Sequence, residues 1–162
     1  KIKEMLEQHS ESRNYNMLPL DEADGLLNIL RSKAILDRHE YICFQGDRFL
    51  ENTPTTEIEF MGRKARFPIG PFLLASRLQV PVIFYFSMRE PGMRYKFFFR
   101  IAEDADKNAE TKPGKGSDSK PAGSLNPKPE ILLLQQYVKA LEEIVQQYPS
   151  QWFNYYRFWD KL

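Results

Sequence analysis

Apolar residues recur at helical spacing in four parts of the chain. Residues 1–10 place apolar side chains at positions i, i+3 and i+4, which is typical of an amphipathic helix. Residues 21–36 repeat this pattern behind a capping Asp21. The segment Phe67–Leu78 opens with two prolines, which the first turn of a helix tolerates. The longest segment of this kind is Ile131–Gln147, and we expect the helix to end before Pro149. The spacing therefore predicts four helices.

Segments rich in β-branched and aromatic residues alternate with these helices. Glu40–Gln45 is the strongest predicted strand, and Ile58–Met61 is a short one. Val80–Phe86 carries its proline near the start, where a missing N–H does little harm. Arg94–Ile101 is its expected hairpin partner, and the two are joined through the turn Glu90–Gly92.

The order of these elements predicts the fold class. Strands alternate with helices for most of the length, and the last two strands form a hairpin. This order is typical of an α/β fold, which we expect to be a mixed, mostly parallel sheet flanked by helices, with a C-terminal hairpin and helices. With 162 residues, the whole chain (1–162) is expected to form a single domain with a sizeable core. The polar stretch 104–129 is predicted to be a flexible insertion.

Composition and charge narrow the class of protein. Hydrophobic residues make up 42% of the chain and aromatics 14%, which indicates a folded globular protein. The net charge of +1 gives no argument for a nucleic-acid partner. Residues 1–60 are acidic, however, whereas residues 60–100 are basic and aromatic. This basic half would suit anionic lipid or phosphate, or it is a solvated surface. Its cations are Arg63, Lys64, Arg66, Arg77, Arg89, Arg94, Lys96 and Arg100.

The chain lacks the usual catalytic and metal-binding sets. Cys43 is the single cysteine, so we predict no internal disulfide and no zinc site, and we expect Cys43 to be buried in its strand. The two histidines, His9 and His39, are followed five positions later by Asn14 and Phe44, so neither forms a His-x4-Asp pair. The sequence has no nucleophile elbow and no phosphate-binding glycine loop, and we predict no metal and no cofactor.

The end of the Glu40–Gln45 strand carries the best candidate for a polar site. The apolar run stops at Gly46, and Asp47 and Arg48 follow at once. Enzymes of the α/β class place polar residues at the carboxyl ends of buried strands, and an Arg fork donates two parallel hydrogen bonds to phosphate or carboxylate. The alternative is a turn in which Asp47 and Arg48 pair in solvent. The residues alone leave both interpretations open.

Two further features are candidates for binding. The basic turn Gly62–Arg66 precedes the expected helix start near Gly70, whose free N–H groups would hold an anion. The alternative is that these cations only keep an exposed loop soluble. The aromatic tail after Pro149 either packs on the sheet as a C-terminal helix, which we expect, or forms a lipid contact. Its expected packing residues are Trp152, Phe153 and Trp159.

Several segments, in this order, resemble motifs of the lysophospholipid acyltransferases, specifically the branch of late acyltransferases of lipid A biosynthesis. Phe44–Arg48 is similar to a strand that ends in an Asp motif, and Phe60–Arg63 is similar to a Phe-x-Gly turn. Phe67–Ala75 resembles the entry to a Leu-Ala helix, and Val80–Val82 resembles a Val-Pro strand. Tyr148–Arg157 is similar to a Pro-Glu-Gln-Trp…Arg-Arg ending.

The resemblance implies a function and a site. It implies transfer of a fatty acyl chain from acyl carrier protein or acyl-CoA to a lipid or glycolipid hydroxyl, by a peripheral protein at the cytoplasmic face of the inner membrane. Asp47, Arg48 and Arg63 would then belong to the substrate-binding region, and Gly62 and Gly70 would allow close backbone approach. The general base of that family is a His-x4-Asp/Glu dyad. It would lie upstream of residue 1, so this C-terminal part would be inactive alone.

A second hypothesis needs no catalysis. The chain would be an α/β binding module whose basic half recognises anionic lipid or protein partners. A His-x4-Asp or His-x4-Glu pair in the parent gene would favour the enzyme, and its absence would favour the module.

Overall fold

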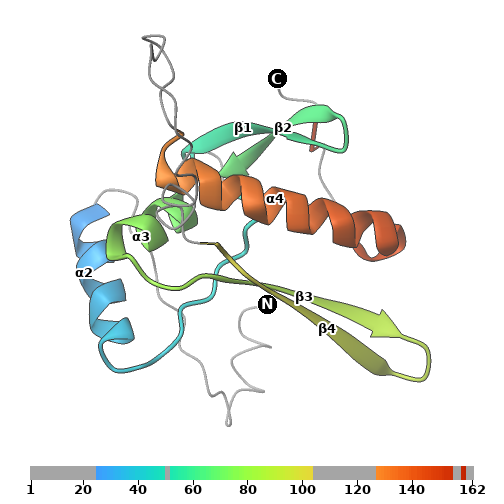
Figure 1. Cartoon of the computed structure of the whole chain (residues 1–162), viewed down its shortest axis with the longest axis horizontal. Helices are drawn as coiled ribbons and strands as arrows, with labels where there is room; N and C mark the ends of the chain where they lie inside the picture. Colours follow the sequence, from blue (N-terminus) through green and yellow to red (C-terminus); the bar gives the residue numbers. More distant parts are fainter. Residues whose placement is uncertain (1–24, 50–51, 104–126, 155–157, 160–162) are drawn as a thin grey trace, which may run out of the picture.

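The computed structural model describes residues 25–49, 52–103, 127–154 and 158–159 (Figure 1). The predicted helix over residues 1–10, the capping Asp21 and residues 104–126 of the predicted insertion lie outside the described residues. In chain order, the elements are α2 (Gly25–Leu36), β1 (Thr55–Phe60), β2 (Arg63–Pro68), α3 (Gly70–Leu78), β3 (Ile83–Glu90), β4 (Arg94–Ile101), α4 (Pro129–Gln147) and the 3-10 turn η1 (Pro149–Gln151).

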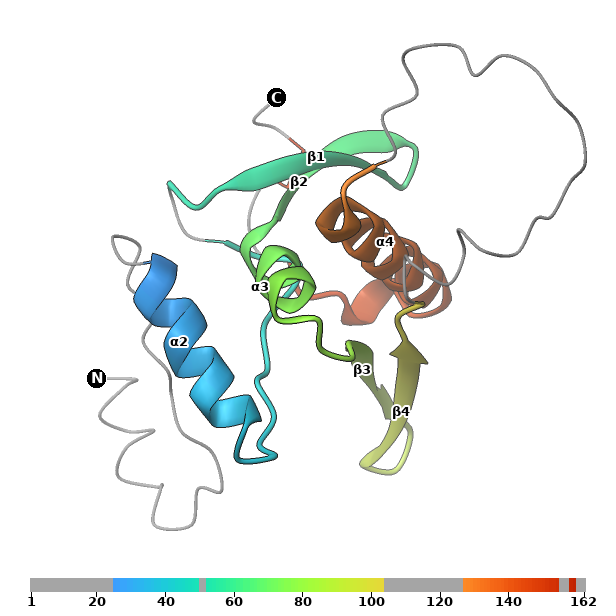
Figure 2. The same cartoon turned by 60° about the vertical axis from the view of Figure 1, so that its left-hand side comes forward.

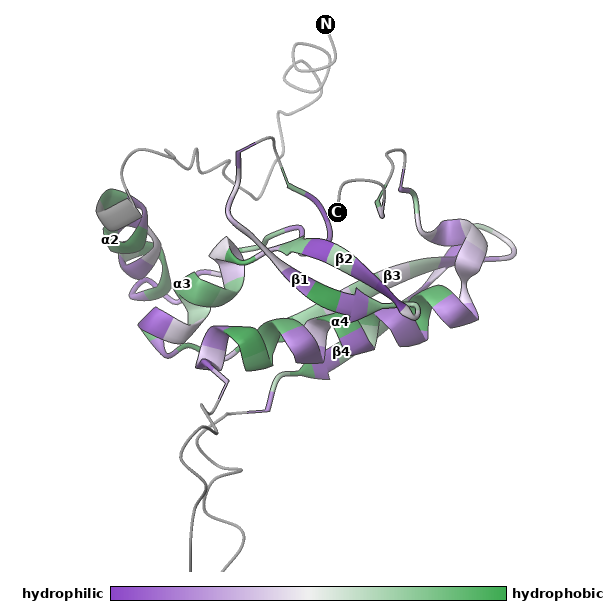
Figure 3. Cartoon of the chain, turned by 90° about the horizontal axis from the view of Figure 1, so that it is seen from above, coloured by the Kyte–Doolittle hydropathy of each residue, from purple (hydrophilic) through white to green (hydrophobic). Residues whose placement is uncertain are grey.

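Helix α4 lies between two β-hairpins. In Figure 1, the β1–β2 hairpin runs along one side of α4 and the β3–β4 hairpin runs along the other. Helix α3 packs against α4, and α2 packs against α3 (Figure 2). Hydrophobic and hydrophilic stretches alternate along α4, as its helical period requires (Figure 3). The predicted helix Ile131–Gln147 is therefore confirmed, and the helix that was expected to end at Leu78 is confirmed as α3.

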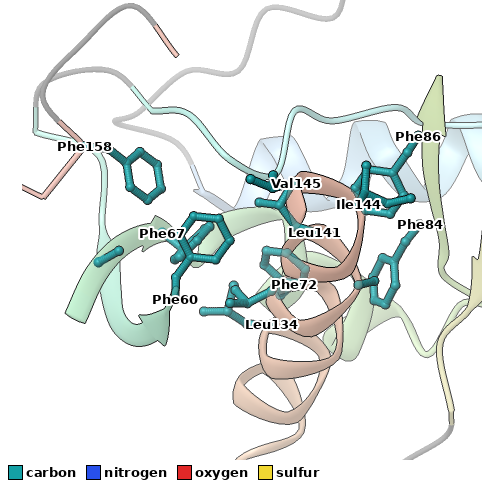
Figure 4. Close-up of a cluster of buried hydrophobic side chains, with 13 residues drawn as sticks. Phe60, Phe67, Phe72, Phe84, Phe86, Leu134, Leu141, Ile144, Val145 and Phe158 are labelled. Carbon is teal, nitrogen blue, oxygen red and sulfur yellow. The ribbon is translucent and has the colours of Figure 1, made fainter. Parts of the chain in front are cut away.

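The hydrophobic core is built on both sides of α4. The buried residues of this helix recur every three or four positions, and they include Leu134, Leu141 and Val145. Figure 4 shows Phe60, Phe67 and Phe158 on one side of α4 and Phe84 and Phe86 on the other. These five phenyl rings are 8% exposed or less, so both hairpins are attached to the helix by buried aromatic residues.

The β1–β2 hairpin closes through a two-residue turn. Phe60 pairs with Arg63, and the intervening Met61 and Gly62 have φ angles of 55° and 74°. Positive φ at both central residues defines a type I′ turn, which matches the twist of a two-stranded ribbon. The sequence predicted the strand but treated residues 62–66 as a turn. That prediction was wrong for most of the segment, because Ala65 and Phe67 alternate inward and make it strand β2.

The predicted hairpin is confirmed, with β4 at the predicted bounds, but β3 runs from Ile83 to Glu90 and not from Val80 to Phe86. Its strands pair antiparallel from Ile83↔Ile101 to Glu90↔Arg94, and the connection contains Gly92 at a φ of 77°. Phe84 and Phe86 alternate toward α4, as expected for a half-buried strand.

The predicted fold class is wrong. The described residues form two separate two-stranded antiparallel hairpins, and no parallel sheet occurs among them. The prediction depended on a central strand at Glu40–Gln45, but this segment is not a strand. A strand exists only where a neighbour pairs with it, and no described strand pairs with this one. Tyr41 and Cys43 are accordingly exposed, so the expected burial of Cys43 was also wrong.

Candidate functional site

Asp47 joins two segments that are 105 positions apart in the sequence. Its carboxylate accepts hydrogen bonds from Nε and Nη2 of Arg48 at 3.0 and 3.1 Å. It also accepts a hydrogen bond from the indole Nε1 of Trp152 at 3.1 Å. The Asp47 side chain is 14% exposed, whereas Arg48 is 44% exposed. A half-exposed guanidinium therefore pairs with a nearly buried carboxylate. The pairing agrees with the alternative interpretation of a turn, except that Trp152 also binds the carboxylate.

Trp152 is fixed in turn by an aromatic cluster. Its ring lies 5.2 Å from Phe60, 5.1 Å from Phe158 and 6.0 Å from Trp159, measured between ring centroids. All three pairs have edge-to-face geometry, which aromatic side chains prefer. Trp152 and Trp159 are partly buried and both contact Phe60 of β1, so the predicted packing of these two rings on a sheet is confirmed. The predicted C-terminal helix is wrong among residues 148–154 and 158–159, where only a 3-10 turn occurs, and Phe153 is exposed.

The segment before Trp152 is hydrogen-bonded to the β3–β4 hairpin. Gln151 accepts a hydrogen bond from the backbone N–H of Arg89 at 2.7 Å and donates one to its carbonyl at 2.9 Å. Tyr148 donates a hydrogen bond to Glu90 at 3.1 Å. Desolvation and then this hydrogen bond raise the pKa of Tyr148. The terminal segment thus connects one hairpin directly to Asp47.

Gly46 is a close-approach glycine that the sequence reasoning did not assign to the site. A Cβ atom at this position would lie 2.6 Å from Cζ of Tyr137 in α4. The ring of Tyr137 packs against Phe72, Phe84 and Phe86, at centroid distances of 5.6, 5.5 and 6.1 Å. Only glycine fits here without displacing that ring, so Gly46 sets how closely the Asp47 loop approaches α4.

The remaining predicted site residues are distributed along the β1–β2 hairpin. Gly62 is needed for its positive φ, and no atom lies near enough to make it a close-approach position. The guanidinium of Arg63 lies over the Trp159 ring at 5.4 Å, so Arg63 borders the aromatic cluster. Gly70 begins α3 beyond the far end of β2, and a six-residue strand spans roughly 20 Å. The structure therefore groups Asp47 and Arg48 with the cluster beside Arg63 and leaves Gly70 outside it.

The cations of the segment Gly62–Arg66 do not gather at the start of α3, where the sequence suggested a candidate anion site. Arg63 and Lys64 are at the turn end of β2, far from the first turn of α3. Arg66 is nearer, but its guanidinium donates to Thr55 Oγ1 at 2.8 and 3.0 Å. The cations of this strand therefore do not converge on the free N–H groups of the helix.

A cavity of about 250 Å³ lies elsewhere, between α4 and β4. Its lining includes the ion pair of Arg100 and Glu143, whose atoms approach to 3.1 Å. None of the predicted site residues lines it. His39, the described histidine, sits in an exposed turn at a φ of 60°, so it is no candidate for a general base.

The described residues hold neither a metal-binding cluster nor a helix that could cross a membrane. No group of three or more His, Cys, Asp or Glu side chains in that part of the chain is arranged to hold a metal ion. Among the helices of those same residues, none combines the length and the apolar character that crossing a membrane requires.

Comparison with known proteins does not identify the chain. No protein-family profile matches it, and no curated protein matches it. The resemblance to lysophospholipid acyltransferases therefore stays a prediction from the sequence.

Proposed function

We propose that this chain is the acceptor-binding part of an acyltransferase. The enzyme would move a fatty acyl chain from acyl carrier protein or acyl-CoA to a hydroxyl group of a lipid or glycolipid at the cytoplasmic face of the membrane. One observation carries the proposal: the Trp152 indole donates to the Asp47 carboxylate at 3.1 Å. Two segments that resemble different motifs of that family thus meet at a single carboxylate.

The chemistry gives Arg48 and Asp47 different roles. In acyl transfer, the acceptor oxygen attacks the thioester carbonyl while a base takes its proton, and the carrier thiolate leaves and is protonated. Asp47 already accepts bonds from Arg48 and Trp152, so it is a positioning residue. Arg48 is exposed enough to bind a phosphate or another anionic group of the acceptor. The base would be the histidine of the dyad that the resemblance implies, since neither His9 nor His39 has the required spacing.

Substitution of Arg48 in the complete enzyme tests this assignment. Arg48→Ala is expected to lower kcat/KM for a phosphorylated acceptor about tenfold or more, because one charge-assisted contact contributes roughly 1.5–3 kcal/mol. Arg38→Ala is a matched control. Arg38 is also an exposed arginine paired with a nearby carboxylate, that of Glu40, but it lies in the turn after α2.

The outcomes are distinct. Loss of transfer in Arg48→Ala with normal transfer in Arg38→Ala supports the proposal, provided that both variants unfold at the wild-type urea concentration. Equal transfer by wild type and Arg48→Ala removes Arg48 from the site. Absence of acyl transfer by the complete wild-type protein, with either carrier as donor, contradicts the function itself.

A further inference from the structure

The β3–β4 hairpin carries aromatic side chains on both faces, together with Arg94, Lys96 and Arg100 on the inner face, and the outer face is exposed. On the inner face, Phe84 and Phe86 contact Tyr137, and Phe98 contacts Tyr148. The outer face carries the alternate, exposed positions of the two strands. Its large apolar side chains, here named the aromatic face, are each 52–77% exposed. They are Ile83, Tyr85, Tyr95, Phe97, Phe99 and Ile101.

The aromatic face is an ordered surface. Ile83 pairs with Ile101 and Tyr85 with Phe99 across the two strands, which places these side chains on one side of the hairpin. The Tyr85 ring lies 5.8 Å from Phe97 and 5.3 Å from Phe99, so the central rings already pack on one another. A contiguous apolar patch of this kind marks a surface that contacts a membrane or another molecule. Because its rings are packed in advance, covering it costs little side-chain entropy.

The charges around the face indicate what covers it. Between Ile83 and Ile101 the hairpin carries four basic residues and one acidic residue. Arg89 pairs with Tyr95 and shares the aromatic face, whereas Arg94, Lys96 and Arg100 lie at inner-face positions, where Arg100 pairs with Glu143. Arg89, Arg94 and Lys96 are exposed near the turn end of the hairpin. An exposed Tyr- and Phe-rich surface on a net-positive hairpin matches an anionic bilayer, in which rings enter the headgroup region and long cationic side chains reach phosphates. A second copy of the chain fits less well, since it would bring two net-positive hairpins together.

We infer that the protein binds an anionic lipid bilayer through the aromatic face of the β3–β4 hairpin. Met93, in the turn between β3 and β4, is a further exposed apolar side chain of this hairpin. The inference rests on the proposed function only in its choice of a lipid occupant, because an enzyme that acylates a lipid must reach the bilayer. The residues involved are separate from Asp47 and Arg48, so each proposal can fail alone.

Vesicle co-sedimentation tests the inference. The full chain is mixed with vesicles of phosphatidylcholine and phosphatidylglycerol in equal parts, and separately with phosphatidylcholine alone. Tyr85→Ser combined with Phe99→Ser is expected to weaken binding to the anionic vesicles about tenfold or more, because two apolar rings no longer leave water. Arg89→Gln is expected to weaken it roughly fivefold, as the cation that shares the aromatic face is lost.

A matched control removes the same residue types elsewhere. Tyr41 and Phe153 are 90% and 58% exposed and lie outside the hairpin, so the variant that combines Tyr41→Ser with Phe153→Ser should bind like wild type. Equal binding by the hairpin variant and this control would overturn the inference. So would equal wild-type binding to both kinds of vesicle. A wild-type dimer that Tyr85→Ser with Phe99→Ser makes monomeric, without vesicle binding, would assign the face to a protein interface instead.

The test also separates this inference from the proposed function. Arg48→Ala should keep full vesicle binding. The hairpin variant should keep acyl transfer to a water-soluble, short-chain acceptor in the complete enzyme and lose transfer to an acceptor in a bilayer. Loss of transfer to both acceptors would place the hairpin in the catalytic machinery and would also contradict the inference.

Discussion

Gly46→Ala tests how tightly the Asp47 loop packs on α4. The new Cβ would lie 2.6 Å from Cζ of Tyr137, whereas non-bonded carbons prefer about 3.5–4.0 Å, so the ring or the loop must move about 1 Å. Phe72, Phe84 and Phe86 surround the ring and oppose that movement. Overpacking of this kind costs about 1–3 kcal/mol. Replacing glycine also restricts the unfolded chain, which stabilises the folded state by about 0.4–1 kcal/mol. The free energy of unfolding is therefore expected to fall by roughly 1–2 kcal/mol.

Urea unfolding followed by circular dichroism measures this loss as a lower midpoint at an unchanged slope. Gly70→Ala is the matched control, because no atom lies within 4 Å of a Cβ at that position, and it should be neutral or slightly stabilising. In a double-mutant cycle, Tyr137→Leu should remove most of the cost of Gly46→Ala, since the clashing ring is gone. Wild-type stability of Gly46→Ala, or strict additivity in the cycle, would refute the close approach.

Three further predictions concern the core and the site. Leu134→Ala should lower the free energy of unfolding by about 2–5 kcal/mol in urea titrations, because Leu134 is fully buried; a loss below about 1 kcal/mol would contradict this. The raised pKa of Tyr148 means that the stability contributed by its neutral phenol is complete below pH 10.0 and is lost as the pH rises through the folded-state pKa. Thermal melts of Tyr148→Phe should therefore depend less on pH above 10.0 than those of wild type, and identical profiles would exclude the effect. Trp152→Phe should cost about 1–3 kcal/mol, since Asp47 loses a donor while the ring contacts persist; the effect should vanish in an Asp47→Ala background.

Local pattern predicted the elements that are defined by their own residues. The segments of β3 and β4 are rich in β-branched and aromatic residues on either side of a Pro-Gly turn, and α4 carries a long helical period, so both were predictable. Residues Glu40–Gln45 have the composition of a strand, but composition cannot supply the neighbour that hydrogen-bonds to it. The parallel sheet was predicted from that segment and failed with it. Residues 62–66 were misjudged because the cations Arg63 and Lys64 obscured the inward alternation of Ala65 and Phe67.

The site was predictable only in part. The sequence places Asp47 beside Arg48, and their pairing in a turn was one of the two interpretations left open. The contact with Trp152 joins positions 105 apart, and no local pattern indicates a contact at that separation. Gly46 was visible as the end of an apolar run, but its role depends on the position of Tyr137 in α4. Gly70 was grouped with Gly62 by motif order, and the length of β2 separates them.

The position of α4 has a consequence for synthesis of the protein. Both hairpins precede this helix in the chain, and both attach to it. An isolated two-stranded hairpin is marginally stable in water, so neither hairpin gains its support until residues 129–147 have left the ribosome. In a nascent chain that stops before residue 129, the phenylalanines of both hairpins would therefore be exposed to chaperones and proteases. They become buried once α4 has been synthesised and packs against both hairpins.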